Sequence, residues 1–252
     1  MVASYPDVEV CYVLGVPVHA MALGQVVELL DGVIERKQPL QVGVVNAAKV
    51  VNMYRDPKLK EDVLSSDLIL ADGAAVVWAS KILGQPLPER VAGIDLMYEL
   101  FRKGSEKGYK IYCLGATEEV SAEIEQRVHR DYPGVELVGR HHGYFGRDDE
   151  EMIAQKIAEA NPDILFVAMT SPKKEHFLAR WSETIKVPVT HGVGGSFDVM
   201  AGKVQRAPDL WQKWGLEWLY RVKQEPRRLW KRYFVTNALF IWMVIKAKLF
   251  GK

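Results

Sequence analysis

The sequence predicts an α/β fold: a mostly parallel, Rossmann-like sheet with helices on both faces, followed by a helical C-terminal appendage. Short apolar segments alternate with longer segments of helical periodicity through most of the chain. Strands that are apolar on both sides are typical of parallel sheets covered by helices. Aromatic and basic residues become dense after Pro208. We therefore expect an α/β core of residues 1–207 and an appendage of residues 208–252.

The expected strands are short apolar runs bounded by turn residues, and the helices between them show apolar positions three and four residues apart. Thr117 stands where an N-cap is expected, with Glu119 in the first turn after it. Strands are expected at residues 10–13, 41–45, 67–71, 110–114, 135–138, 163–168 and 188–191. Helices are expected at residues 26–34, 50–54, 74–83, 94–105, 148–160, after Thr117 and after Pro172.

The composition is that of an ordinary folded protein, with 252 residues, 48% hydrophobic residues and a net charge of +1. A nearly neutral chain has no general attraction for nucleic acid, so no nucleic-acid partner is expected. Cys11 and Cys113 have no metal-ligand spacing, and two cysteines fit a reducing cytoplasm. The N-terminus has no pattern of a secretory signal.

A ligand site is expected where the strands end. In open parallel sheets, ligands bind in the crevice beyond the carboxyl ends of the strands. The residues that fall at these ends are Asn46, Asp72, Gly115, Thr170 to Lys174, and Gly192 to Ser196.

Asp72 directly follows a buried strand and precedes Gly73. A carboxylate at the mouth of the sheet is a candidate general base for a hydroxyl group. The alternative is structural, because Asp72 could instead cap the helix that begins at Ala74.

The turn formed by Gly194 and Gly195, with Asp198 shortly after it, follows the last strand. Glycine-rich turns let backbone N–H groups approach a phosphate, and a following helix would add its positive end. The turn lacks the Gly-Lys-Ser/Thr of a Walker loop and is not the dinucleotide fingerprint in its usual place. The alternative is a tight turn that needs positive φ angles.

Three further groups are candidates for substrate binding. Arg90 lies among turn residues and suits a phosphate or carboxylate, unless it only pairs with Glu89 at the surface. Thr170 and Lys174 lie at a strand-to-helix turn, where an anionic ligand would relieve the conflict between cations and the helix dipole; simple exposure is the alternative. His142 and Tyr144 are interpreted as a strand-end loop that makes hydrogen bonds, because the adjacent histidines do not form a metal site.

The appendage carries seven lysines and arginines between Lys213 and Arg232, against only Glu217 and Glu225. Interfacial aromatics accompany them, and an almost wholly apolar run follows at residues 233–245. This composition suits an anionic membrane surface. Because a spanning helix needs roughly 20 apolar residues, we expect the run to lie on the bilayer. The alternative is a buried helix with a basic solvent face.

Several longer motifs occur in a fixed order along most of the chain. They are Asn46-Ala47, Ala71-Asp72-Gly73, Pro86 to Gly93, His141 to Phe145, Gly192 to Asp198, Ala201-Gly202-Lys203 with Arg206-Ala207-Pro208, and Gly215 to Arg221 before Glu225-Pro226.

With these motifs the chain resembles the WecB/TagA/CpsF glycosyltransferase family (glycosyltransferase family 26). The resemblance implies an inverting enzyme that moves a sugar from a UDP-sugar to a polyprenyl-diphosphate-linked saccharide on the cytoplasmic membrane face. It also implies that Asp72 is the catalytic base, that Arg90 is a pocket arginine, and that Arg221 and Arg228 belong to an appendage that closes over the site. No cofactor is implied, and self-association into a homo-oligomer is plausible.

The sequence contains no Asp-x-Asp pair of the kind that holds a divalent metal on a sugar nucleotide. A metal-independent transferase is therefore expected, with arginine, lysine and backbone N–H groups meeting the leaving-group charge. Two departures from the family pattern, Val44 in place of Thr and Lys174 in place of Gln, leave N-acetylhexosamine and glucose open as the donor sugar. The other functions considered are a dinucleotide-dependent oxidoreductase and a non-catalytic membrane scaffold.

Overall fold

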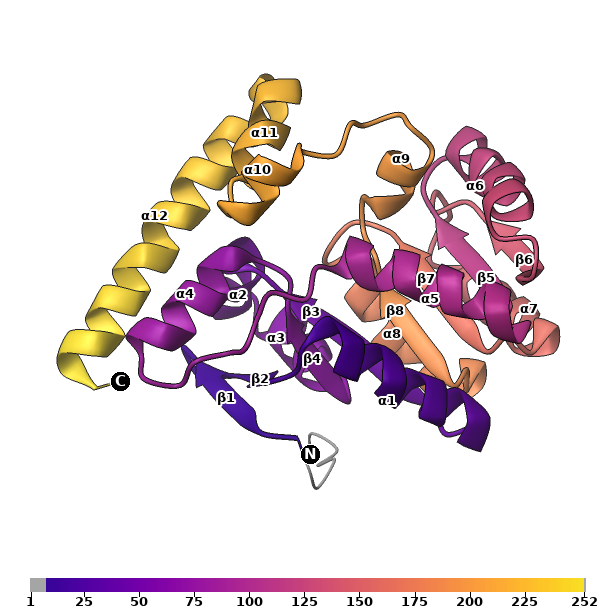
Figure 1. Cartoon of the computed structure of the whole chain (residues 1–252), viewed down its shortest axis with the longest axis horizontal. Coiled ribbons are helices and arrows are strands. Elements are labelled where there is room, and N and C mark those ends of the chain that lie inside the picture. Colours follow the sequence, from indigo (N-terminus) through magenta and orange to yellow (C-terminus); the bar gives the residue numbers. More distant parts are fainter. Residues whose placement is uncertain (1–7, 252) are drawn as a thin grey trace.

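A computed structural model describes residues 8–251, with the side chain of Arg228 excepted. Within that range the chain alternates strands and helices and ends in a long helix (Figure 1). The strands are β1 (Val10–Val13), β2 (Val16–His19), β3 (Leu40–Val45), β4 (Leu68–Ala71), β5 (Lys110–Gly115), β6 (Glu136–His141), β7 (Ile164–Ala168) and β8 (Val189–Gly192).

The helices bear out the helical periodicity and add several elements. Thr117 caps its helix as expected, because its side chain accepts a hydrogen bond from the Val120 N–H at 3.3 Å. The helices are α1 (Leu23–Arg36), α2 (Ala47–Arg55), α3 (Pro57–Leu64), α4 (Ala74–Ile82), α5 (Gly93–Lys107), α6 (Glu118–Asp131), α7 (Glu150–Ala160), α8 (Lys173–Ile185), α9 (Ser196–Met200), α10 (Asp209–Lys213), α11 (Glu217–Gln224) and α12 (Pro226–Phe250).

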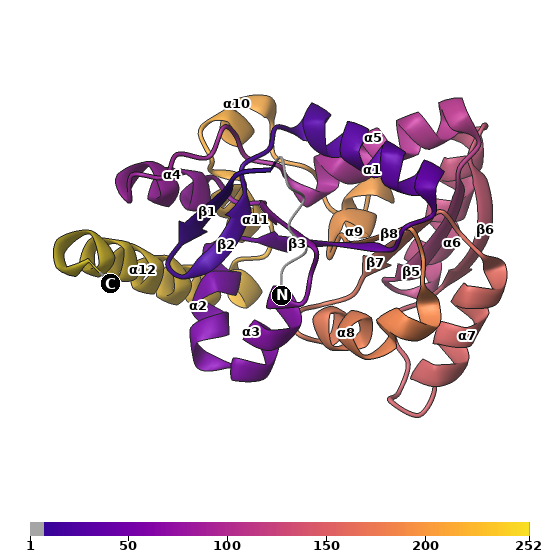
Figure 2. The same ribbon diagram turned by 90° about the horizontal axis from the view of Figure 1, so that it is seen from below.

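Six of the described strands form one parallel sheet in the order β4-β3-β8-β7-β5-β6. Helices α1, α5, α6 and α9 cover one face, and α2, α3, α7 and α8 cover the other, as Figure 2 shows for the layers. The expectation of a parallel sheet with helices on both faces is confirmed.

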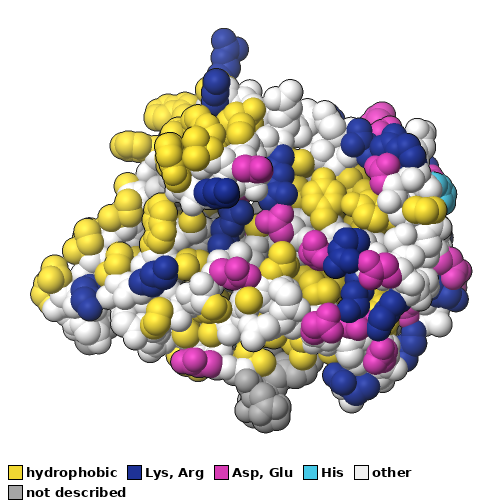
Figure 3. Space-filling model, in the orientation of Figure 1, with side chains coloured by type: hydrophobic (Ala, Val, Ile, Leu, Met, Phe, Trp, Pro, Cys, Tyr) yellow, Lys and Arg dark blue, Asp and Glu magenta, His cyan; other side chains and the backbone are white. Residues whose placement is uncertain are grey.

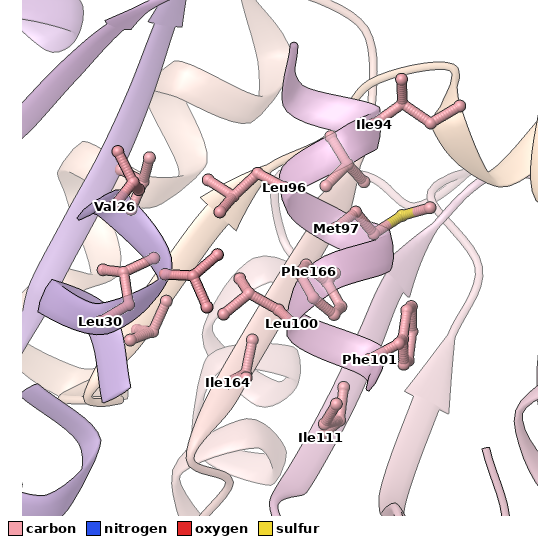
Figure 4. Close-up of a cluster of buried hydrophobic side chains, with 14 of the residues drawn as sticks. Val26, Leu30, Ile94, Leu96, Met97, Leu100, Phe101, Ile111, Ile164 and Phe166 are labelled. Atoms are coloured by element: carbon pink, nitrogen blue, oxygen red, sulfur yellow. The ribbon is translucent and has the colours of Figure 1, made fainter. Parts of the chain in front are cut away.

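The core on the α1 and α5 face is made of aliphatic and aromatic side chains. Figure 4 shows Val26 and Leu30 of α1 and Leu96 and Leu100 of α5 pointing toward strand residues such as Phe166 of β7. These side chains are almost fully buried, so each removes its apolar surface from water. This packing holds the sheet edge, where the strands end, in a fixed position.

A hairpin that the periodicity did not predict covers the outer edge of the sheet. Strands β1 and β2 pair antiparallel, and β2 lies beside the edge strand β4. The His19 ring accepts a hydrogen bond from the Ile69 N–H at 3.0 Å through Nδ1. The hairpin therefore satisfies a backbone group that an open edge strand would leave unpaired.

Candidate active site

Three strand ends converge at one point of the sheet edge. Strands β4, β3 and β8 are neighbours, and they are followed by Asp72, Asn46 and the Gly194-Gly195 turn. After β3 the chain continues into α2 on one face, whereas after β8 it continues into α9 on the other. Chain segments that diverge in this way leave a crevice between them, which is where α/β sheets bind ligands.

Asp72 lies in this crevice and is half-buried. Its Oδ1 accepts a hydrogen bond from the Gly93 N–H at 2.9 Å, and its Oδ2 lies 3.5 Å from Asn46 Nδ2. Gly73 occupies the N-cap position of α4, and no side-chain hydrogen bond caps that helix. The carboxylate instead meets the first N–H of α5, whose positive end stabilises a negative charge. The capping alternative for α4 is therefore wrong, and Asp72 remains a candidate base.

His191, which was not among the predicted site residues, contacts Gly93, the residue that hydrogen-bonds to Asp72. The ring is fully buried at the end of β8, and its Nε2 lies 3.1 Å from the Gly93 carbonyl oxygen. Burial lowers the pKa of His191 to about 4, so the ring is neutral near pH 7 and donates from Nε2. Gly93 thus links His191 to Asp72, because its carbonyl oxygen accepts from the ring and its N–H donates to the carboxylate.

The Gly194-Gly195 turn has the positive φ angle that glycine favours, with φ of 56° at Gly194. The following helix α9 has only five residues, so it contributes little of the helix dipole that the sequence led us to expect. A positive charge comes instead from the appendage. Arg221 Nη1 lies 3.8 Å from the position that a Cβ on Gly195 would occupy, and Asp198 Oδ2 lies 3.9 Å from it.

Arg90 reaches the same region from the segment before α5. The neighbouring Val91 N–H donates to the Ala71 carbonyl at 2.9 Å, which places this segment beside the end of β4. Glu89 does not pair with Arg90, because its carboxylate accepts the Leu23 N–H at 2.6 Å. Arg90 is instead paired with Glu217 of α11 at 2.5 Å.

Lys174 is turned away from solvent beneath the turn that follows β8. Its side chain is buried against Gly192, and its ammonium pairs with Glu175, which also binds Lys49 at 2.8 Å. Burial and the charge of Lys49 lower the pKa of Lys174 to about 7. Burial would raise the pKa of Glu175, but the two lysines lower it to about 2. Thr170, by contrast, is exposed.

The other predicted binding residues lie at the far half of the sheet edge. Gly115 ends β5, and a Cβ there would meet the Ala168 carbonyl at 2.4 Å, so strand packing alone requires glycine. His142 accepts the Tyr144 N–H at 3.2 Å, and Tyr144 is exposed. Because β4 and β5 are four strand spacings apart, this group lies roughly 19 Å across the sheet from Asp72.

Lys173 holds the loop that carries His142 and Tyr144. Its ammonium donates to the carbonyls of Gly143 and Phe145 at 2.9 and 2.8 Å and lies over the Phe145 ring. The two cations at the start of α8 therefore already have protein partners, and no anionic ligand is needed to balance them.

The appendage is held against the body close to the crevice. Gly215 packs onto Ala74 and Trp78 of α4, and α12 packs along α2. Phe240 and Val244 of α12 belong to the same buried cluster as α2 and α4. The side chain of Arg228, which was predicted to bind substrate, lies outside the part of the chain that the structure describes.

Helix α12 is longer than the apolar run suggested. It has 25 residues, and its stretch Leu229–Phe250 is long and apolar enough to cross a membrane by length and composition. The expectation that this segment is too short to span a membrane is therefore wrong. The face that turns away from the body is exposed and apolar, and includes Trp230, Phe234, Ile241, Trp242, Ile245 and Leu249.

The outer surface of the appendage combines these apolar side chains with cations. Figure 3 shows hydrophobic side chains gathered over the upper part of the appendage, with lysine and arginine side chains beside them. Trp78 and Trp214 are also more than half exposed. Contiguous exposed apolar surface of this kind marks an interaction site.

Among residues 8–251, the structure brings Asn46 beside Asp72, and Asp198 and Arg221 beside Gly195, while Arg90 pairs with Glu217 of the appendage. Sequence reasoning missed His191, although it ends a buried strand by the same rule that selected Asp72. It also missed the pairing of Glu217 with Arg90, which no local pattern reveals. In that same range, no three histidine, cysteine, aspartate or glutamate side chains gather as a metal site.

The comparisons with known proteins identify the family of the chain. The model of a family described as the glycosyl transferase WecG/TagA/CpsF family matches residues 11–252. The match covers nearly the whole chain, and the chain therefore belongs to this glycosyltransferase family.

Three of the similar curated proteins share the name N-acetylglucosaminyldiphosphoundecaprenol N-acetyl-beta-D-mannosaminyltransferase. The protein of Bacillus spizizenii is 40% identical over 76% of this chain and 73% of its own length. The protein of Bacillus subtilis is 34% identical over 79% of this chain and 77% of its own length. The protein of Staphylococcus aureus is 31% identical over 94% of this chain and 92% of its own length.

The buried ring of His191 makes stability depend on pH. Its pKa in the folded chain lies below that of an unfolded histidine. Between about pH 6.5 and pH 4 the unfolded chain therefore binds one more proton, and the free energy of unfolding decreases as the pH is lowered. From pH 7 to pH 5 we expect a loss of about 2 kcal/mol from this ring. His19, whose pKa burial also lowers, acts in the same direction.

Urea unfolding of His191→Gln at both pH values tests this expectation, with the exposed His129→Gln as the matched control. The first variant should lose that part of the pH dependence and the control should keep it. An unchanged pH dependence in His191→Gln would show that the ring is not held neutral as described.

Proposed function

We propose that the chain is an inverting, metal-independent glycosyltransferase that uses a UDP-sugar and a polyprenyl-diphosphate-linked saccharide. The observation that carries this proposal is the Asp72 carboxylate, which the Gly93 N–H fixes in the same crevice as the Gly194-Gly195 turn. Arg221 supplies a cation above that turn. The names of the relatives support the acceptor, since those enzymes act on N-acetylglucosaminyldiphosphoundecaprenol.

In this mechanism Asp72 removes the proton from the acceptor hydroxyl while that oxygen attacks the anomeric carbon. The new C–O bond forms as the bond between the anomeric carbon and the diphosphate oxygen breaks, and UDP leaves from the opposite face. A single displacement on an α-linked donor gives a β-linked product, in agreement with the beta-D linkage in the relatives' names. A positioned general base of this kind contributes roughly 100- to 10,000-fold to rate.

The charge that develops on the leaving diphosphate is met by Arg221 and by backbone N–H groups of the Gly194-Gly195 turn. Arginine binds phosphate oxygens in a planar, bidentate manner, and donors fixed in advance stabilise charge that develops in the transition state. Lys174 is not assigned this role, because its ammonium is buried and paired with Glu175.

For the donor sugar we propose N-acetylmannosamine, by analogy with the relatives. Val44 and Lys174, the two departures from the family pattern, are both more than nine-tenths buried. Their burial weakens the argument from these residues for glucose as the donor sugar. Neither side chain is exposed where a donor sugar could contact it.

We further propose that the appendage places the crevice at the cytoplasmic face of the membrane without crossing it. The middle of α12 packs on α2 through Phe240 and Val244, and a helix cannot cross the bilayer while its centre is bound to the body.

The first prediction from this proposal concerns the base. Asp72→Asn keeps the size of the side chain but cannot take up the proton, so we expect a loss of about 100-fold or more in kcat. UDP release is measured with a short-chain polyprenyl-diphosphate-sugar acceptor and a panel of UDP-N-acetylmannosamine, UDP-N-acetylglucosamine and UDP-glucose, with EDTA present.

The exposed Asp148→Asn is the matched control and should keep full activity. Near-normal activity of Asp72→Asn would remove this carboxylate from the mechanism, and it is also what a membrane scaffold without catalysis would show. Binding of a nicotinamide dinucleotide in place of UDP would favour the oxidoreductase alternative.

The second prediction concerns the membrane. Replacement of Phe234, Trp242 and Ile245 by serine removes exposed apolar side chains from α12 without disturbing its packed face. Burial of each such side chain contributes about 1.5–3 kcal/mol, so binding to vesicles with anionic lipid should fall by at least about 10-fold.

Cosedimentation measures the change, with Met152→Ser as the control on an exposed residue of α7. If the triple variant binds vesicles as the unchanged chain does, α12 is not the docking surface. Sedimentation velocity on the same variant distinguishes a second role of this face, because loss of a dimer would show that it mediates self-association.

A further inference from the structure

Four charged side chains from three separate segments form a closed ring beside the crevice. Arg90 precedes α5, Asp95 lies in the first turn of α5, Arg206 lies between α9 and α10, and Glu217 begins α11. Glu217 is 2.5 Å from Arg90 and 3.8 Å from Arg206, and Asp95 is 2.5 Å from Arg206 and 3.8 Å from Arg90. Charges of opposite sign therefore alternate around the ring.

The ring is better suited to hold its three segments together than an isolated surface pair would be. Its side chains are 19–31% exposed, so water screens them only in part. Each carboxylate meets two arginines, and networks contribute where single exposed pairs contribute little. Asp95 and Glu217 also lie in the first turns of their helices, where the dipole favours negative charge.

Glu217 is the one member of the ring that belongs to α11, and it determines where the next turn of that helix points. Residues four apart on a helix lie on the same face, so Arg221 follows Glu217 directly. The ring therefore fixes the face of α11 that presents Arg221 to Gly195. Within the described residues, no ion pair is formed by the Arg221 guanidinium, which lies with the Asp198 carboxylate beside Gly195.

We propose that Glu217 is a positioning residue, which latches α11 onto Arg90 and Arg206 and thereby holds Arg221 in place for the diphosphate of the donor. The inference rests on the proposed function and deepens it. It also assigns Arg90 to the latch, whereas the sequence had suggested that Arg90 contacts the substrate.

The test compares Glu217→Gln, Arg221→Gln and the double variant, in the full chain, by calorimetric titration with UDP and by hydrogen exchange of residues 217–224. Arg221→Gln loses a charge-assisted contact and should bind UDP about 10-fold or more weakly, with exchange unchanged. Glu217→Gln should weaken UDP binding to a similar extent and also raise exchange in α11.

The double variant should bind no more weakly than the weaker single variant, because Glu217 acts through Arg221. Glu217→Asp keeps the charge and should retain most of the affinity. Lys223→Gln, an exposed change on the same helix, is the control and should leave both measurements unchanged.

Three outcomes would overturn the inference. If Glu217→Gln leaves UDP affinity and hydrogen exchange unchanged, the ring does not act through Arg221. The same follows if the losses of UDP affinity from the two single substitutions multiply in the double variant. If the unchanged chain binds no UDP at all, the proposed function itself fails, and the inference fails with it.

Discussion

The divergence of the chain after β3 and β8 is the constraint on which the rest of the site depends. These neighbouring parallel strands end at the same edge, and the chain then continues to opposite faces of the sheet. The gap that results cannot be filled by either connection. The end of β4 brings Asp72 to it, and the start of α5 brings the Gly93 N–H that fixes the carboxylate.

The appendage completes what the core leaves open. The core provides a carboxylate and a glycine-rich turn, but its one-turn helix α9 offers little positive charge. Arg221 of α11 provides that charge from above, and α12 provides an exposed apolar face beside it. One segment thus combines the cation that we propose for the diphosphate with an exposed apolar surface suited to a membrane.

Much of the fold could be predicted from the sequence, because each buried strand is a short apolar run with a turn residue after it. The β1–β2 hairpin was missed because β2 has only four residues and contains Pro17. So short a segment shows almost no alternation of apolar and polar residues. The helix α12 was underestimated because Lys231 and Arg232 interrupt the apolar pattern, although they continue the helix.

The site could be predicted only to the extent that the ends of the strands could be predicted. The rule placed Asp72, Asn46 and the glycine turn correctly at the crevice edge, but it could not tell where a side chain points. Lys174 meets the same rule and is buried against Gly192, while the glycine at Gly115 is explained by strand packing. Glu217 and Arg90 are 127 residues apart, and only the folded chain shows that they pair.

The measurement that tests the central claim most directly is hydrogen exchange of the full chain with and without UDP. If the crevice and the appendage together form one diphosphate site, UDP should protect residues 193–198 and residues 217–224 at the same concentration. Protection confined to residues 141–145, or protection of the turn without α11, would contradict the account.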